Sequence, residues 1–260
     1  MQRLALALLV SILGACRTVS VPAPPRVIDL THPFDAETVY WPTAEPFRLA
    51  VVFHGQTEGG FHYEANAFAA AEHGGTHLDA PCHFAEGQRS VDAVPLEDLI
   101  GPGVVVDVSE ACARDRDHRV TIAELEAWEH EHGRIPDGAI VLLCTGFGRY
   151  WPDRVRYLGT DARGPEAVAA LHFPGLDAPA ARWLVGERAI AAVGLDTASI
   201  DLGQSKTFDA HRALAQANVP ILENVAALEQ LPARGFRVFA LPMKIAGGSG
   251  GPVRIAALVP

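Results

Sequence analysis

Short apolar runs rich in valine and isoleucine recur along the chain and predict β-strands buried in a core. They cover residues 27–30, 49–53, 104–108, 140–143, 191–195 and 236–241, and helical patterns lie between them at 121–132, 178–187 and 208–217. Thr121 followed by Glu124 is typical of a helix start, and Gly133 of a helix end. Strands and helices intervene without a regular β–α–β rhythm. The pattern therefore predicts one compact α/β domain of the mixed α+β kind, spanning 27–260, with a mixed β-sheet core flanked by helices.

Residues 1–16 are expected to precede this domain as a signal peptide. A positive start is followed by an apolar run at 4–13 that is too short to span a membrane stably, and then by Leu-Gly-Ala-Cys. This order resembles a bacterial lipoprotein signal in which Cys16 becomes the lipidated N-terminus. A plain secretory peptide with an incidental cysteine is the alternative. Residues 17–26 include three prolines and are expected to form an extended tether.

The lipid anchor predicts an exported protein on the periplasmic face of a bacterial membrane, in contact with the membrane only through its N-terminus. Arg17 follows Cys16 in place of the aspartate of the familiar inner-membrane retention signal, which favours the outer membrane. The formal net charge of −10 argues against nucleic acid as a partner. It does not exclude a small anionic substrate, because a bound metal can reverse the local field.

Three cysteines remain for the exported domain if Cys16 is lipidated, and an odd number cannot all pair. Cys144 ends an apolar run and is predicted to be a buried small residue. Cys82 lies within a histidine-rich motif but is interpreted as a packing residue. The sequence leaves open whether Cys112 or Cys144 forms a disulfide.

The strongest chemical signal is residues 73–84, which read H-G-G-T-H-L-D-A-P-C-H-F. Histidine, aspartate and glutamate are the side chains that hold borderline divalent metals. In an extended stretch alternate side chains point the same way, so His77, Asp79 and His83 are expected on one side. The glycines at 74 and 75 can turn the backbone and bring His73 to the same centre.

A second group of candidate ligands lies downstream. His211 falls in a predicted helix, and Glu223 follows a short apolar run at 219–222. A helix followed by a returning strand can place both side chains at one cavity. Glu223 lies between the apolar residues Leu222 and Val225, and a metal would remove the cost of burying its carboxylate.

The motif H-x-G-T-H-x-D-x-P-x-H resembles the signature of the cyclase-like metal-dependent hydrolases, which include bacterial kynurenine formamidases and isatin hydrolases. Matching segments recur as G-L-D-T-A-S-I-D at 194–201, H-R-A-L at 211–214, L-E-N-V at 222–225, and the closing stretch with G-G-S-G-G-P at 240–254. The resemblance runs from about residue 26 to the C-terminus and is greater to the isatin hydrolases. It implies a cyclase-like fold and a homo-oligomer, a dimer or larger.

The resemblance also implies roles for individual residues. Metal ligands are expected at His73, His77, Asp79, His211 and Glu223, with the two carboxylates able to serve two metals. His83 matches the residue that donates and accepts protons. Trp41 matches an aromatic residue that packs on the substrate ring, Phe61 is a further candidate substrate contact, and Gln204 is a weaker candidate for contact with substrate or metal.

These roles predict a hydrolase that opens a small cyclic or aryl amide, such as an isatin-like lactam, with metal-activated water. An arylformamidase that hydrolyses N-formylkynurenine is the alternative, and a lipid-anchored metal- or solute-binding protein is the alternative of another class. The cofactor is predicted to be Mn²⁺ or Zn²⁺, one or two ions per subunit. The segment 247–251 is not interpreted as a phosphate cradle or a serine nucleophile, since neither a helix nor a strand–turn–helix pattern surrounds it.

Overall fold

The computed structural model describes residues 24–260, so the predicted signal peptide and most of the predicted tether lie outside the described residues. Within the described part, no helix is long and apolar enough to cross a membrane. The strands are β1 Arg26–Asp29, β2 Arg48–Gln56, β3 His62–Ala69, β4 His77–Asp79, β5 Ile100–Asp107, β6 Arg119–Val120, β7 Ile140–Cys144, β8 Gly175–Leu176, β9 Ala192–Leu195, β10 Ile221–Glu223, β11 Arg234–Pro242 and β12 Gly250–Val259. The α-helices are α1 Leu96–Leu99, α2 Ser109–Arg114, α3 Ile122–His132, α4 Arg154–Leu158, α5 Ala178–Arg188 and α6 Asp209–Gln216.

The main sheet closes on itself. Its order is β1-β12-β11-β5-β7-β9-β10-β4, and β12 also pairs with β4. Neighbouring strands from β5 through β7 and β9 to β10 are parallel, whereas β4, β11, β12 and β1 join by antiparallel pairings. The predicted mixed sheet is confirmed, and its closure into a barrel leaves every strand except β1 paired on both edges.

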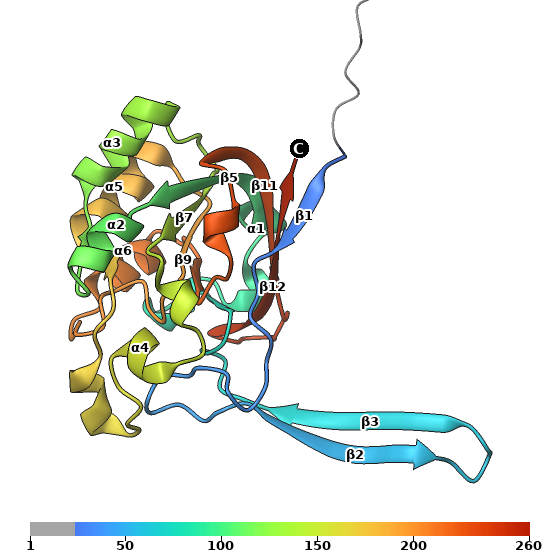
Figure 1. Cartoon of the computed structure of the whole chain (residues 1–260). Helices are drawn as coiled ribbons and strands as arrows, with labels where there is room; N and C mark the ends of the chain where they lie inside the picture. The colour runs from blue at the N-terminus through green and yellow to red at the C-terminus, as the bar shows by residue number, and fades with distance from the viewer. Residues whose placement is uncertain (1–23) are drawn as a thin grey trace, which may run out of the picture.

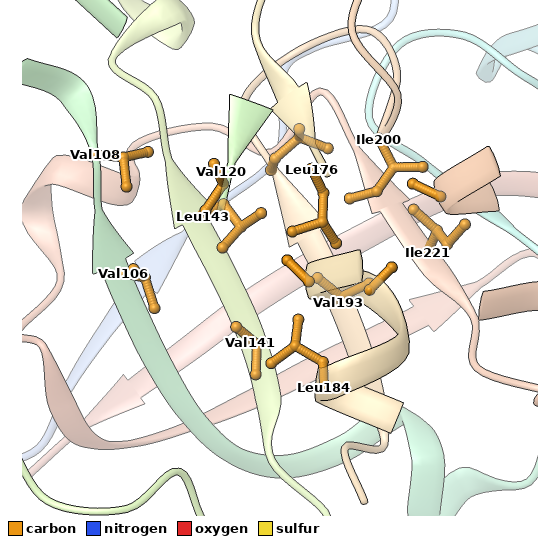
Figure 2. Packing of buried hydrophobic residues seen from close by; sticks show 14 of the residues in the cluster. Val106, Val108, Val120, Val141, Leu143, Leu176, Leu184, Val193, Ile200 and Ile221 are labelled. Carbon is orange, nitrogen blue, oxygen red and sulfur yellow. The ribbon is translucent and has the colours of Figure 1, made fainter. Parts of the chain in front are cut away.

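Successive residues of the barrel strands alternate between two hydrophobic clusters. Ile140 and Leu142 of β7 belong to the cluster inside the barrel, together with Leu78 and Leu222. Val141 and Leu143 point the other way and pack under the helices, and Figure 2 shows Leu184 of α5 among these outer residues. Both faces of the central strands are therefore buried, which accounts for their continuous apolar sequences.

Helices cover one side of the barrel, as the predicted pattern requires (Figure 1). The helix predicted from Thr121 is α3, which has a capping box between Thr121 and Glu124 and ends at Gly133. The other two predicted helices are α5 and α6. Each bound lies within two residues of the prediction.

The hairpin β2–β3 extends away from the barrel (Figure 1). The prediction that 49–53 is a strand is correct, but the prediction that it is buried is wrong for the single chain: Leu49, Val51 and Val52 are each at least 60% exposed. An apolar run predicts a strand because of its residue types, whereas its burial depends on what packs against it. In the single chain no other layer covers this hairpin among the described residues.

The three cysteines of the described chain are all free. Cys112 and Cys144 are buried, and Cys82 is half-buried against the cluster inside the barrel. The predicted burial of Cys144 and the packing position of Cys82 are confirmed, and neither Cys112 nor Cys144 forms a disulfide.

Candidate metal centre and active site

The centre is built on two short neighbouring strands of the main sheet, β4 and β10. In β4 and β10, Glu223 pairs directly with His77, and Leu222 pairs with Leu78. The two leucines point into the barrel, so His77, Asp79 and Glu223 point out of it on the same side. All three polar side chains are buried. Alternation along the strands thus gathers an imidazole and two carboxylates at one place.

His211 reaches the same place from the first turn of α6. Its Nε2 lies 3.2 Å from Asp79 Oδ2 and 3.1 Å from Glu223 Oε1. Its Nδ1 lies 2.7 Å from Asp201, which also accepts the backbone N–H groups of Ala210 and His211. Asp201 therefore anchors the start of the helix and orients the ring with the same carboxylate.

His73 is brought in by a turn of the backbone, as predicted. Gly75 has φ +59°, and a Cβ at Gly74 would lie 2.1 Å from the ring of Tyr40. His73 Nδ1 then lies 2.6 Å from Asp79 Oδ1, and His73 Nε2 lies 2.8 Å from Ser249 Oγ. The two glycines are required for different reasons, one for its conformation and one for the close approach of an aromatic ring.

His83 lies at the centre for a different reason from the one predicted. Strand β4 ends at Asp79, and Pro81 begins a short 3₁₀-helix, η1 Pro81–His83. The predicted common parity of His77, Asp79 and His83 is therefore wrong beyond Asp79, because proline starts a new element there. The turn stacks His83 on His73 with ring centroids 3.7 Å apart. His83 keeps more solvent contact than the other members of the group.

In three imidazoles, a hydrogen bond on the far side of the ring determines which nitrogen carries the proton, and the other nitrogen faces the carboxylates. His77 Nδ1 donates to Gly75 O at 2.9 Å, and His211 Nδ1 faces Asp201. Ser249 Oγ donates to Glu72, so it accepts the Nε2–H of His73. When neutral, each ring would present its other nitrogen, unprotonated, to Asp79 or Glu223. This arrangement brings lone pairs together around a space that suits a cation.

The buried Nε2 of His77 supports the same interpretation. It lies 3.1 Å from Asp79 Oδ1 and 3.5 Å from Glu223 Oε2, yet it has no hydrogen-bond partner among residues 24–260. His77, Asp79 and Glu223 each offer a donor atom within 4.8 Å of the others, and His73, Asp79 and His83 form a second such group. Nitrogen and oxygen donors at this spacing, each oriented by a second partner, fit a divalent transition metal.

Without a metal, protons hold the charges of this cluster in balance. Burial lowers the pKa of His77, but the negative charges of Asp79 and Glu223 outweigh it and raise that pKa to about 9. Burial and the charge of Asp79 raise the pKa of Glu223. Burial would raise the pKa of Asp79, yet the facing imidazoles hold it well below its usual range. The donor set thus demands positive charge, which a metal ion supplies in place of protons.

A cavity of about 300 Å³ opens above these residues. Its floor holds the five candidate ligands, with His83 at the side, and its walls include Trp41, Phe84 and Phe208. This volume is at the small end of the usual range for small-molecule sites. Trp41 is half-buried and packs edge-to-face on Phe173 with ring centroids 6.4 Å apart, so it is held in place from behind.

Two candidate contacts lie elsewhere in the chain. Phe61 is 61% exposed at the far end of the β2–β3 hairpin, which carries it away from the cavity of its own chain. Gln204 is exposed, and its amide donates to Asp117 at the surface. The structure therefore does not bring Phe61 or Gln204 to the cavity, because the hairpin directs one outward and a surface hydrogen bond holds the other.

Residues that support the ligands were not singled out from the sequence. Asn224 donates to Gly75 O, the same carbonyl that orients His77, and Tyr157 donates to Asn224. Asp201 and Ser249 orient His211 and His73 as described above. Asp201, Asn224 and Ser249 stand inside the quoted motifs D-T-A-S-I-D, L-E-N-V and G-G-S-G-G-P, whereas Tyr157 lies outside them. That position was the available signal, but only the folded structure shows which imidazole each one serves.

The glycines of the closing motif also have a structural role. A Cβ at Gly250 would lie 2.5 Å from Leu78 O and 2.6 Å from His73 Cε1. Gly250 pairs with Asp79 at the start of β12. The segment therefore lets β12 close the barrel tightly against the ligand strand.

The barrel and the buried His/Asp/Glu cluster define a metal-dependent hydrolase. Residues 28–202 match the model of the Cyclase family, described as "Putative cyclase", and the chain belongs to this family. It is 35% identical to an isatin hydrolase of Roseibium aggregatum over 203 residues, covering 75% of this chain and 74% of that protein. It is 29% identical to a kynurenine formamidase of Sphingopyxis alaskensis over 229 residues, covering 88% and 96% of the two chains.

A solved structure of isatin hydrolase A from Ralstonia solanacearum superposes with a TM-score of 0.81 at 35% identity, covering 91% of this chain and 92% of that one. The predicted family and fold are confirmed. The chain is accordingly a hydrolase that acts on carbon–nitrogen bonds other than peptide bonds.

Replacing Asp201 by Asn is expected to weaken metal binding about 10- to 100-fold, because the amide no longer holds His211 Nδ1–H with a charged acceptor. Asp209→Asn, an exposed change in the same helix, is the matched control and should bind metal like the wild type. Metal affinity measured by competition with a chelating dye checks this. Equal affinity of both variants would mean that Asp201 only anchors the helix.

Proposed function

We propose that the enzyme hydrolyses a small aromatic cyclic amide, such as isatin, to the open amino acid form. The observation that carries the proposal is the set of three imidazoles with free nitrogens around Asp79 and Glu223, on the floor of a cavity with aromatic walls. Two relatives at 35% identity are isatin hydrolases, which supports the choice of isatin. A bound divalent ion would activate water and polarise the amide carbonyl.

The residues of the chain would divide the remaining work. Trp41 forms part of the aromatic wall, where a flat ring can stack, and the ligands keep their geometry through Asp201, Gly75 and Ser249. Partial burial of its ring beside the cavity lowers the pKa of His83 to about 4, although part of the residue stays in contact with solvent. His83 is then neutral at neutral pH and can accept a proton from the attacking water and return it to the leaving nitrogen.

His83→Ala is expected to retain bound metal and to lose about 10²- to 10⁴-fold in kcat, because a proton carrier is removed while the ligands stay. His77→Ala is expected to lose both metal and activity, because it removes a buried donor whose second nitrogen is already fixed. Elemental analysis of each purified variant, with turnover followed by the loss of isatin absorbance, checks this division. His130→Ala, an exposed histidine on α3, is the control.

Loss of metal from His83→Ala would instead make His83 a ligand, an arrangement that its grouping with His73 and Asp79 allows. No turnover of isatin by well-metallated wild type would reject the substrate while leaving the hydrolase class intact.

Trp41→Ala is expected to raise KM for an aromatic lactam about 3- to 10-fold, with a smaller effect on kcat, because stacking is felt equally in the ground and transition states. Steady-state kinetics on isatin measure both constants, and metal content should not change. An unchanged KM with a collapsed kcat would show that Trp41 orders the catalytic loop and does not hold the ring.

Hydrolysis of N-formylkynurenine is the second candidate, favoured by the likeness to kynurenine formamidases over 88% of the chain. The predicted export disfavours it, since a tryptophan-degrading step is expected inside the cell. The ratio of kcat/KM for the two substrates decides between them. A binding protein without turnover is set aside by membership of a hydrolase family.

We propose Mn²⁺ or Zn²⁺ as the cofactor, one or two ions per subunit, because mixed nitrogen and oxygen donors suit both metals. Asp79 and Glu223 each direct one oxygen toward His77 and the other toward His211, which favours space for two. We also propose a homo-oligomer, a dimer or larger. The exposed apolar side chains of the β2–β3 hairpin favour it, and sedimentation at graded concentrations tests it.

We further propose that residues 1–16 are a lipoprotein signal and that the mature protein carries lipid on Cys16, facing the periplasm from the outer membrane. Cys16→Ser is expected to abolish partitioning of the expressed protein into a detergent phase, because it removes the acceptor thiol. Neither the loading of the protein with metal nor the control change Arg17→Ala should alter this partitioning. Partitioning that persists after Cys16→Ser would reject the lipid anchor.

A further inference from the structure

A second group of metal-ligating side chains lies on the β2–β3 hairpin, outside the cavity described above. It consists of His54 on β2 and of His62 and Glu64 on β3. His54 pairs with Glu64 across the hairpin, and His62 precedes Glu64 by two residues. Residues opposite each other and residues two apart share one face of a ribbon, so all three side chains stand together.

The turn that joins the strands fixes this register. Thr57 N–H donates to Phe61 O at 2.9 Å, and Gly60 N–H donates to Thr57 O at 3.0 Å. Gln56 then pairs with His62, and His54 with Glu64. The arrangement is a property of the hairpin backbone and does not depend on the barrel.

The donor atoms converge on a single oxygen. His54 Nδ1 and His62 Nε2 each lie 3.0 Å from Glu64 Oε1. One donor atom from each residue lies within 4.8 Å of the others, and the two rings are nearly perpendicular with centroids 5.4 Å apart. Tetrahedral zinc places its donors about 3.3 Å apart, given bonds of about 2.0 Å. Small side-chain rotations would bring all three to one ion.

We infer that His54, His62 and Glu64 form a second metal site, selective for ions of the Zn²⁺ and Cu²⁺ class. Two imidazoles and one carboxylate are the donor set that these ions prefer over Mg²⁺ or Ca²⁺. Between half and two-thirds of each side chain is exposed, so water reaches the remaining coordination positions. Glu64 supplies the negative charge, and the imidazoles keep the site from being a simple acidic cluster.

The position of the site gives it a physical consequence. A two-stranded hairpin that no layer of its own chain covers is only marginally stable in water before a second subunit packs on it. An ion held by His54 on one strand and by His62 and Glu64 on the other joins the strands close to their turn. Binding to the paired strands alone would stabilise them by mass action. The site is therefore a clamp on the projecting hairpin, outside the cavity of its own chain.

Zinc binding to the full chain in the His77→Ala background isolates this site, since that change is expected to empty the main centre. Equilibrium dialysis at micromolar free Zn²⁺, followed by elemental analysis, is expected to show one bound equivalent. His54→Ala and His62→Ala should each lose it, and Glu64→Gln should weaken it. His130→Ala, an exposed histidine outside the group, should bind like its parent.

Hydrogen exchange gives a readout that separates a clamp from adventitious binding. Zn²⁺ should slow exchange of the amides of β2 and β3 when His54, His62 and Glu64 are present, and should have no effect on them in His62→Ala. Unchanged circular dichroism establishes that the variants are folded. Equal zinc stoichiometry in the parent and both histidine variants would overturn the proposal, as would bound zinc that leaves hairpin exchange unaltered.

Discussion

Two carboxylates buried side by side impose the constraint on which the centre depends. Asp79 and Glu223 have lost nearly all contact with water, and each raises the cost of charging the other. Three imidazoles surround them, and each is turned by a hydrogen bond on its far side so that a bare nitrogen faces the pair. Such a cluster is tolerable only with protons or a cation inside it. The surrounding structure holds each imidazole about 3 Å from a carboxylate oxygen.

The barrel supplies this means through the two-residue period of its strands. His77 and Asp79 flank Leu78, and Glu223 follows Leu222, so the same register that buries both leucines inside the barrel directs the ligands outward. A slip of one residue in either strand would bury a charge in the core and expose an apolar side chain. The hydrophobic core and the metal centre therefore specify each other. Gly250 allows β12 to approach closely enough to enforce that register from the other edge.

The sequence predicts what depends on residue type and local spacing. The capping box of α3 joins Thr121 to Glu124, three residues further along the chain, so it can be recognised locally. The turn before His77 follows from the backbone freedom of glycine alone. The sequence does not predict what depends on neighbours distant in the chain. The apolar run of β2 has the composition of a core strand, but no layer of the single chain covers it. Asp201 lies eight residues before the start of α6, and nothing in the local sequence pairs it with His211 until the fold places His211 Nδ1 against it.

His83 differs from the proposed metal ligands in how firmly the fold holds it and in how much solvent reaches it. Each of the three imidazoles proposed as metal ligands faces a carboxylate on one side and is held by a hydrogen bond on the other, and two of the three are buried. His83 stands on a three-residue helix that Pro81 starts, stacked on His73 at the side of the cavity and open to solvent. A ligand gains from rigidity because its geometry sets the metal affinity, whereas a proton carrier must reach both substrate and water. Pro81 therefore separates the two proposed roles, because a continued strand would have placed His83 on the same rigid surface as His77 and Asp79.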